Sequence, residues 1–248
     1  MKRFLSDLMR GPGPQSEPAV HSDMQSFVVQ GVSLEVPQEY ADLTRVMNAL
    51  RKGHYERQEA SALQHNLEQH DRLLDLGSGL GFVACKAGQT LAAENITCVE
   101  ANPSLIPVIK RNLDTNGLSA AKVLHGAVCA TDGPGETDFH VGANFTASSR
   151  SAEGRRRYDT IQVPALSFSE LLSDIRPTVI TCDVEGEELE LFRTPLPPEV
   201  RLVVMEVHLV WLGDVGIQNL FDAMHRQGFV YRSKGSSDAI VCFKRIDS

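Results

Sequence analysis

Short apolar runs and amphipathic helical stripes alternate along the chain from residue 72 onward. One apolar run ends at Leu76 and a later one covers residues 96–100, while Val83, Ala84 and Ala87 share a helical stripe between them. Strands that alternate with amphipathic helices predict a mostly parallel sheet with helices on both faces. The expected strands are residues 72–76, 96–100, 121–130, 178–182, 201–207, 229–232 and 239–244.

The end of the chain predicts one strand of opposite direction. The last two expected strands are joined by residues 233–238 only, and a parallel connection needs roughly a dozen residues or more. The final strand should therefore run antiparallel in a seven-stranded sheet. Residues 131–166 show no regular period, so we expect an irregular region there. Short helices are expected after it, at residues 167–173 and 186–192. A later helix should align Ile217, Leu220, Phe221 and Met224 and end at Gly228.

The N-terminal part has a different pattern. Residues 1–26 are rich in Gly, Pro, Ser and Gln and predict a loose arm. Residues 27–70 predict an extension with short strands within 27–36 and two helices separated by Gly53. Residues 71–248 then form the main domain.

A glycine-rich turn at residues 75–81, which reads DLGSGLG, follows the first strand of the main domain. Glycines let the backbone turn tightly and approach a ligand closely, and the next helix N-terminus offers free N–H groups. Glu100 ends the following strand, where a carboxylate can accept hydrogen bonds from both hydroxyls of a ribose. The expected cofactor-binding residues are Asp75, Gly77, Ser78, Gly79, Gly81 and Glu100.

The spacing of the glycines distinguishes between two candidate cofactors, a dinucleotide such as NAD and S-adenosylmethionine. A dinucleotide fingerprint, G-x-G-x-x-G, would place its third glycine at residue 82, which is Phe82. The sequence G-x-G-x-G, with an acid two residues before the first glycine, is typical of S-adenosylmethionine sites. Asp75 would orient the loop and attract the ammonium group of the methionine moiety. An NAD-dependent oxidoreductase is the disfavoured alternative.

A second polar cluster is expected beside the glycine turn. Asp183 follows the fourth strand, which neighbours the first strand across the switch point where open α/β sheets bind ligands. Glu206 and His208 alternate along the fifth strand, so both should point to one face. We expect Asp183, Glu206 and His208 to converge near the transferable methyl group, and Asp183 to contact the cofactor as well.

These segments resemble the FkbM-type methyltransferases, a family of S-adenosylmethionine-dependent enzymes. Residues 181–188 (TCDVEGEE) and 206–208 (EVH) resemble the family's boxes after the fourth and fifth strands. Residues 53–56 (GHYE) and 100–103 (EANP) resemble two further family segments, although Ala101 and the central Ser-Gly of the glycine turn depart from the usual pattern. The resemblance implies a class I, Rossmann-like methyltransferase fold, and it adds Glu56 and Ala101 to the cofactor site. Ala127 is added by its position, as a backbone contact to adenine.

Methylation of a hydroxyl requires a base, because an alcohol is a poor nucleophile until its proton leaves. His208 is the first candidate, since an imidazole titrates near neutral pH, and Glu206 or Asp183 could orient or replace it. The resemblance implies O-methylation of a small metabolite, such as a sugar or polyketide-like molecule. The same three side chains could hold Mg²⁺ or Mn²⁺, but their spacing is not typical of a metal site and we expect none.

Composition and charge exclude several classes of binding partner and location. The formal net charge of −8 disfavours non-specific nucleic-acid binding. No apolar stretch approaches the length of a membrane-spanning helix, and the N-terminus lacks a secretory apolar core. The five cysteines have no metal-site or redox spacing and predict buried free thiols, which indicates a cytoplasmic protein.

The sequence leaves three questions open: the type of acceptor, the presence of catalysis and the role of a basic loop. An N- or RNA-directed methyltransferase and a non-catalytic cofactor-binding module are compatible with the same fold. Arg150 and residues 155–157 (RRR) form a basic loop, which is either a solvated surface or a clamp for an acidic acceptor. Asn144, Ser148 and Ser149 in that loop are candidate acceptor contacts.

Overall fold

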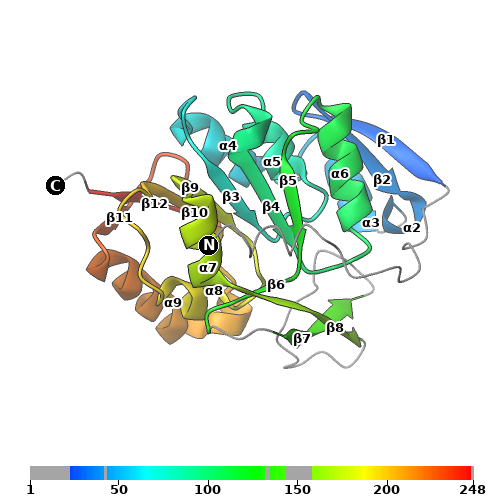
Figure 1. The fold of residues 1–248 in the computed structure, drawn as a ribbon. Coiled ribbons are helices and arrows are strands. Elements are labelled where there is room, and N and C mark those ends of the chain that lie inside the picture. Colours follow the sequence, from blue (N-terminus) through cyan, green and yellow to red (C-terminus); the bar gives the residue numbers. More distant parts are fainter. Residues whose placement is uncertain (1–22, 42–43, 132–134, 143–157, 247–248) are drawn as a thin grey trace.

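The fold was analysed in a computed structural model that describes residues 23–41, 44–131, 135–142 and 158–246. Its centre is a seven-stranded sheet of order β11-β12-β10-β9-β3-β4-β5 (Figure 1). The strands are β3 (Leu73–Leu76), β4 (Ile96–Glu100), β5 (Lys122–His125), β9 (Val179–Cys182), β10 (Leu202–Glu206), β11 (Phe229–Tyr231) and β12 (Ile240–Arg245).

The direction of the strands confirms the expected class of fold. The five strands from β10 to β5 are parallel, and β12 pairs antiparallel with both β10 and β11. β9 lies directly beside β3, which places their carboxyl ends together. This is the Rossmann-like sheet of class I methyltransferases, with a reversed final strand.

Each face of the sheet has its own hydrophobic core, because neighbouring side chains on a strand point to opposite faces. Leu73 packs on one face and Leu74 on the other. The first face is covered by α4 (Arg57–Asn66), α5 (Phe82–Ala87) and α6 (Ile106–Thr115), and the second by α7 (Phe168–Ile175), α8 (Glu188–Phe192) and α9 (Leu209–Arg226). A short 3₁₀ turn, η1 (Ala93–Asn95), leads into β4.

The N-terminal extension packs into the first of these cores. Strands β1 (Met24–Val29) and β2 (Val32–Pro37) form an antiparallel hairpin, followed by α2 (Gln38–Ala41) and α3 (Thr44–Arg51). The buried Asn112 of α6 accepts a hydrogen bond from the backbone N–H of Glu35 at 2.7 Å. The same side chain donates to the carbonyl of Leu80 at 2.8 Å, so it connects the hairpin to the glycine turn.

The prediction of one strand over residues 121–130 is wrong, because the strand is interrupted at Gly126. Here φ is +154° and an added Cβ would lie 2.6 Å from the carbonyl oxygen of Pro164, so only glycine fits this position. β5 ends before the break. The next segment, β6 (Ala127–Cys129), leaves the main sheet and pairs with β8 (Tyr158–Ser167).

The expected irregular region also contains regular structure. β7 (Glu136–Gly142) pairs antiparallel with β8, which completes a small β6-β8-β7 sheet below the main one (Figure 1). Pro164 near the end of β8 hid this strand, since proline within a run argues against a strand. No helix among the described residues is long and apolar enough to cross a membrane.

Candidate active site

A cavity of about 380 Å³ opens at the carboxyl ends of the central strands. The glycine turn and the end of β4 form one wall, and the ends of β9 and β10 form another. The small sheet and the helices α3 and α4 close the remaining sides. The lining residues named below are Gly77, Gly79, Glu100, Ala101, Ala127, Phe139, Asp183, Glu206, His208, Tyr55, Glu56 and Glu59.

Gly77 joins the first two walls. Its φ is +79°, and a Cβ added there would lie 1.9 Å from the carbonyl oxygen of Asp183. Its backbone N–H donates to the carbonyl of Val99 at 2.9 Å, and the N–H of Asp183 donates to the carbonyl of Leu76 at 2.9 Å. The glycine turn therefore lies directly against the end of β9, with bare backbone facing the cavity.

Glu100 fixes the same turn from the neighbouring strand. Its two carboxylate oxygens accept hydrogen bonds from the N–H groups of Gly79 at 2.9 Å and Asn102 at 2.8 Å. Burial raises the pKa of Glu100 to about 7, although these hydrogen bonds act in the opposite direction. Each oxygen keeps a lone pair for a further donor, so the carboxylate fits the hydroxyls of a cofactor ribose.

Three other predicted cofactor residues lie behind the cavity wall. Asp75 is buried and accepts a hydrogen bond from the Thr181 hydroxyl at 2.6 Å, while its Oδ2 has no partner among the described residues. Asp75 borders only a small adjoining pocket. Ser78 donates its hydroxyl to the carbonyl of Asp75 at 3.1 Å, and Gly81 packs against Ile109. These three residues shape the turn from behind.

The remaining predicted cofactor residues reach the cavity. Glu56 precedes α4, Ala101 follows β4, and Ala127 begins β6. The ring of Phe139 on β7 also lines the cavity. Sequence reasoning missed Phe139, because the strand that carries it was expected to be irregular.

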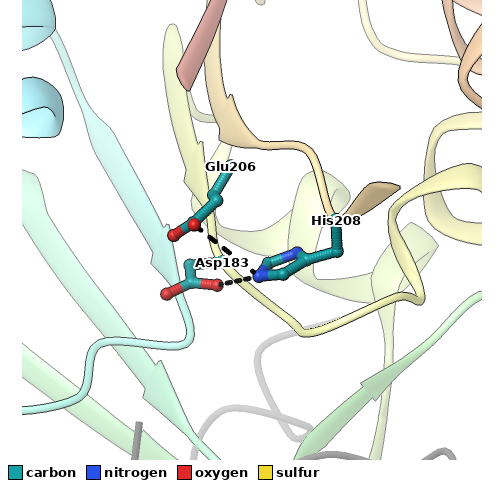
Figure 2. A group of neighbouring side chains, drawn as sticks. All are labelled: Asp183, Glu206 and His208. Carbon is teal, nitrogen blue, oxygen red and sulfur yellow. Dashed lines mark ion pairs between the residues drawn. The ribbon is translucent and has the colours of Figure 1, made fainter. Parts of the chain in front are cut away.

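The structure brings Asp183, Glu206 and His208 together (Figure 2). The Nε2 atom of His208 lies 3.5 Å from Oδ1 of Asp183 and 3.9 Å from Oε1 of Glu206. The expected reason was wrong, however, because β10 ends at Glu206 and His208 occupies the N-terminal cap position of α9. The turn between them, and not strand alternation, directs the imidazole toward the two carboxylates.

Glu188 is a site residue that sequence reasoning did not single out. Its Oε1 lies 2.8 Å from Nδ1 of His208, and its side chain is fully buried. In the sequence it looked like one of several acids that favour a helix N-terminus, and α8 does begin at Glu188 instead of the expected Gly186. Glu185 is a further neighbour, with Oε2 3.8 Å from Nε2 of His208.

The carboxylates around His208 alter its titration. Burial lowers the pKa of the imidazole, but the hydrogen bond to Glu188 and the charge of Asp183 outweigh it and raise the pKa to about 9. Burial and the charge of Glu206 raise the pKa of Asp183, and the charge of His208 opposes them. The expectation that His208 titrates near neutral pH is therefore wrong for the ligand-free chain.

The structure does not describe the predicted basic loop, which contains Arg150, residues 155–157, Asn144, Ser148 and Ser149.

Comparison with known proteins finds matches among methyltransferases. Residues 58–142, which run from α4 to β7 and include the glycine turn and Glu100, match the family model of the methyltransferase small domain. The hexuronic acid methyltransferase AglP of Haloferax volcanii is 28% identical over 151 residues. The aligned region covers 59% of this chain and 59% of that protein, so the chain matches less than two thirds of its relative.

Some solved structures also match the chain, at low sequence identity and with TM-scores below 0.5. The mitomycin 7-O-methyltransferase MmcR superposes with a TM-score of 0.46 at 14% identity, over 84% of this chain and 60% of that one. A putative RNA methyltransferase from Pyrococcus horikoshii superposes with a TM-score of 0.43 at 14% identity, over 99% and 98% of the two chains.

The family match and the sheet order agree with each other. Residues 58–142 match a methyltransferase domain model, and the main sheet has the Rossmann-like strand order.

Proposed function

We propose that the protein transfers the methyl group of S-adenosylmethionine to a hydroxyl oxygen of a small acceptor, with a sugar acid as the first candidate. One observation carries this proposal. The cofactor wall, formed by Gly77, Gly79 and Glu100, shares a single cavity with the cluster of Asp183, Glu206 and His208.

The first wall has the groups that a nucleoside cofactor needs. Gly77 and Gly79 would let the cofactor approach the backbone, and Glu100 would accept hydrogen bonds from its ribose. Glu56 lines the same cavity and would accept a hydrogen bond from the ammonium group of the methionine moiety. When bound, S-adenosylmethionine supplies a methyl group activated by a positively charged sulfur.

The second wall would prepare the acceptor. A hydroxyl placed against Asp183, Glu206 and His208 can give its proton to a member of this cluster as its oxygen bonds to the methyl carbon. Positioning the oxygen close to the methyl group and in line with it contributes about 7–11 kcal/mol in favourable cases. The walls meet at Gly77, which keeps the two reactants adjacent.

Two kinds of evidence support a small hydroxylated acceptor. The curated relative is named for hexuronic acid methylation, and segments 181–188 and 206–208 resemble the FkbM-type methyltransferases. We propose that the chain belongs to that group. The net charge of −8 weighs against the RNA-directed alternative. All five cysteines are buried free thiols, which supports a reducing, cytoplasmic location.

Calorimetric titration with S-adenosylmethionine, S-adenosylhomocysteine and NAD tests the cofactor. We expect micromolar binding of the two adenosyl compounds and none of NAD. Glu100→Ala should weaken adenosyl binding at least tenfold, since it removes the carboxylate that fixes the turn. Glu94→Ala is the matched control, because Glu94 is exposed in η1 before the opposite end of β4. NAD binding, or equal losses in both variants, would refute the cofactor assignment.

A transfer assay with isotope-labelled cofactor tests the acceptor. The panel should contain free and conjugated hexuronic acids, neutral sugars and transfer RNA. Label transferred to a sugar hydroxyl supports the proposal. Label transferred only to RNA would establish the RNA-directed alternative, and cofactor binding without transfer to any acceptor would favour a non-catalytic module.

A further inference from the structure

We propose that Asp183, Glu206 and His208 bind a divalent cation of the Mg²⁺ or Mn²⁺ class, which activates the acceptor hydroxyl. Binding of the cation does not depend on the proposed function. Only its role in activating the acceptor rests on that function.

The spacing of the three side chains suits one ion. One ligand atom from each lies within 4.8 Å of the others, and two of these separations are 3.5 and 3.9 Å. An octahedral ion with bonds of about 2.1 Å places adjacent ligand atoms about 3 Å apart and opposite ones about 4.2 Å apart. Small side-chain rotations would therefore close the cluster around a cation. The three groups come from three separate segments, the ends of β9 and β10 and the start of α9.

The buried Glu188 orients His208 for this role. Because Nδ1 of the imidazole is held by Glu188 at 2.8 Å, Nε2 is the atom that faces Asp183 and Glu206. A histidine that binds a metal usually donates its other ring N–H to a carboxylate or carbonyl, which fixes the ring and increases its basicity. This carboxylate is fully buried and lies on the side of the ring away from the cluster.

Asp183 provides a further observation. Its Oδ1 atom is shielded from solvent and has no hydrogen-bond partner among the described residues, although the side chain as a whole is 43% exposed. The same atom faces Nε2 of His208 at 3.5 Å (Figure 2), which is an ion pair only while the imidazole is protonated. A shielded carboxylate oxygen that loses this partner has an unfavourable free energy unless a cation replaces it. Within the described part of the chain, neither Asp183 nor Glu206 is paired with a lysine or arginine. A cation at the centre would satisfy Oδ1 and offset this negative charge.

The donor set indicates the type of ion and its role. Two carboxylates and one imidazole suit Mn²⁺ and Mg²⁺, which prefer oxygen ligands and octahedral geometry. Three protein ligands leave positions free toward the cavity, where a sugar acid can offer a hydroxyl and a neighbouring oxygen. A bound cation lowers the pKa of such a hydroxyl. With Nε2 bound to the ion, the proton would pass to a carboxylate oxygen that the ion leaves free.

The test is calorimetric titration of the full-length, cofactor-free protein with MnCl₂ alone. We expect one site per chain, and at least tenfold weaker binding in Glu206→Gln and in His208→Gln. Glu59→Gln is the matched control, because Glu59 lines the same cavity but is not a proposed ligand; its affinity should stay within threefold of wild type. Circular dichroism and thermal melting establish that each variant is folded. If either Glu206→Gln or His208→Gln does not fold, the other variant carries the test.

Two results would overturn the proposal. The first is the absence of stoichiometric Mn²⁺ binding. The second is an equal loss in Glu59→Gln and Glu206→Gln, which would mean that the cation responds only to the general negative charge of the cavity. Failure of the proposed function looks different: Mn²⁺ would bind at the site without any methyl transfer. Conversely, the chain could transfer methyl groups in the presence of EDTA and fail to bind Mn²⁺. This result would support the proposed function and refute the cation site.

Discussion

At the scale of single residues, Gly77 has the tightest steric constraint in the site. It belongs to the cofactor wall, yet the atom that excludes a side chain is the carbonyl oxygen of Asp183, from the other wall. A substitution at Gly77 must therefore move the glycine turn away from β9. Such a movement would disturb the cofactor and the cluster together.

Gly77→Ala should weaken S-adenosylmethionine binding at least thirtyfold and lower the melting temperature. A left-handed backbone costs a residue with a Cβ about 1 kcal/mol, and the clash with Asp183 adds to this cost. Gly117→Ala is a close control, since Gly117 has a similar φ of +76° but open space around its Cβ position. Calorimetry and thermal melting measure both effects. If the two variants lose the same affinity, contact with Asp183 is not the cause.

Residue types near the site were easier to predict than their exact roles. Asp183, Glu206 and His208 were identifiable because each ends or follows an apolar strand. The role of Glu188 was hidden, since its partner His208 lies twenty positions further along the chain and only the fold brings them together. The raised pKa of His208 was equally hidden, because it depends on several carboxylates of residues 183–188, a segment far from His208 in the sequence.

At the scale of elements, the main sheet was predictable and its additions were not. Continuous apolar runs indicated the buried parallel strands, and the short 233–238 connection indicated the reversed one. The break at Gly126 could not be predicted from the sequence, because apolar residues lie on both sides of it and the steric constraint comes from Pro164. The β7–β8 pair was missed for a similar reason, since its stability depends on pairing between residues about twenty positions apart.

Asn112 connects three elements, and its loss should affect all of them. Asn112→Ala removes the partners of the Glu35 N–H and the Leu80 carbonyl, so we expect about 2–3 kcal/mol less stability to urea. Cofactor affinity should also fall, because Leu80 belongs to the glycine turn. Asn112→Asp is informative beside it: the carboxylate still accepts from Glu35 but cannot donate to Leu80. Stability equal to wild type in Asn112→Ala would show that the hairpin docks by apolar packing alone.

At the scale of the whole molecule, the cavity concentrates buried acids. Burial raises the pKa of Glu59 to about 7, and that of Glu100 also to about 7. Both values lie above the ordinary value for glutamate, so the folded chain holds protons that the unfolded chain releases. Stability from these groups is present at low pH and is lost as pH rises through about 7. His208, with its pKa raised to about 9, acts in the same direction.

The ligand-free protein should therefore melt several degrees lower at pH 8 than at pH 6, as followed by differential scanning calorimetry. Glu59→Gln should reduce this difference, because it removes one of the titrating groups. The exposed Glu94→Gln serves as the control and should keep the full difference. An equal or higher melting temperature at pH 8 would show that the acids of the cavity are already ionised in the folded chain.

The break at Gly126 has a consequence for how such a protein can diversify. The cofactor wall is complete by the end of β5, while the small sheet that closes the cavity leaves after it and returns through β8 directly into α7. The β7–β8 segment thus follows the complete cofactor wall in the sequence and joins the main fold again at α7. Exchange or extension of this insert can change acceptor selectivity while the methyl donor and its site stay the same.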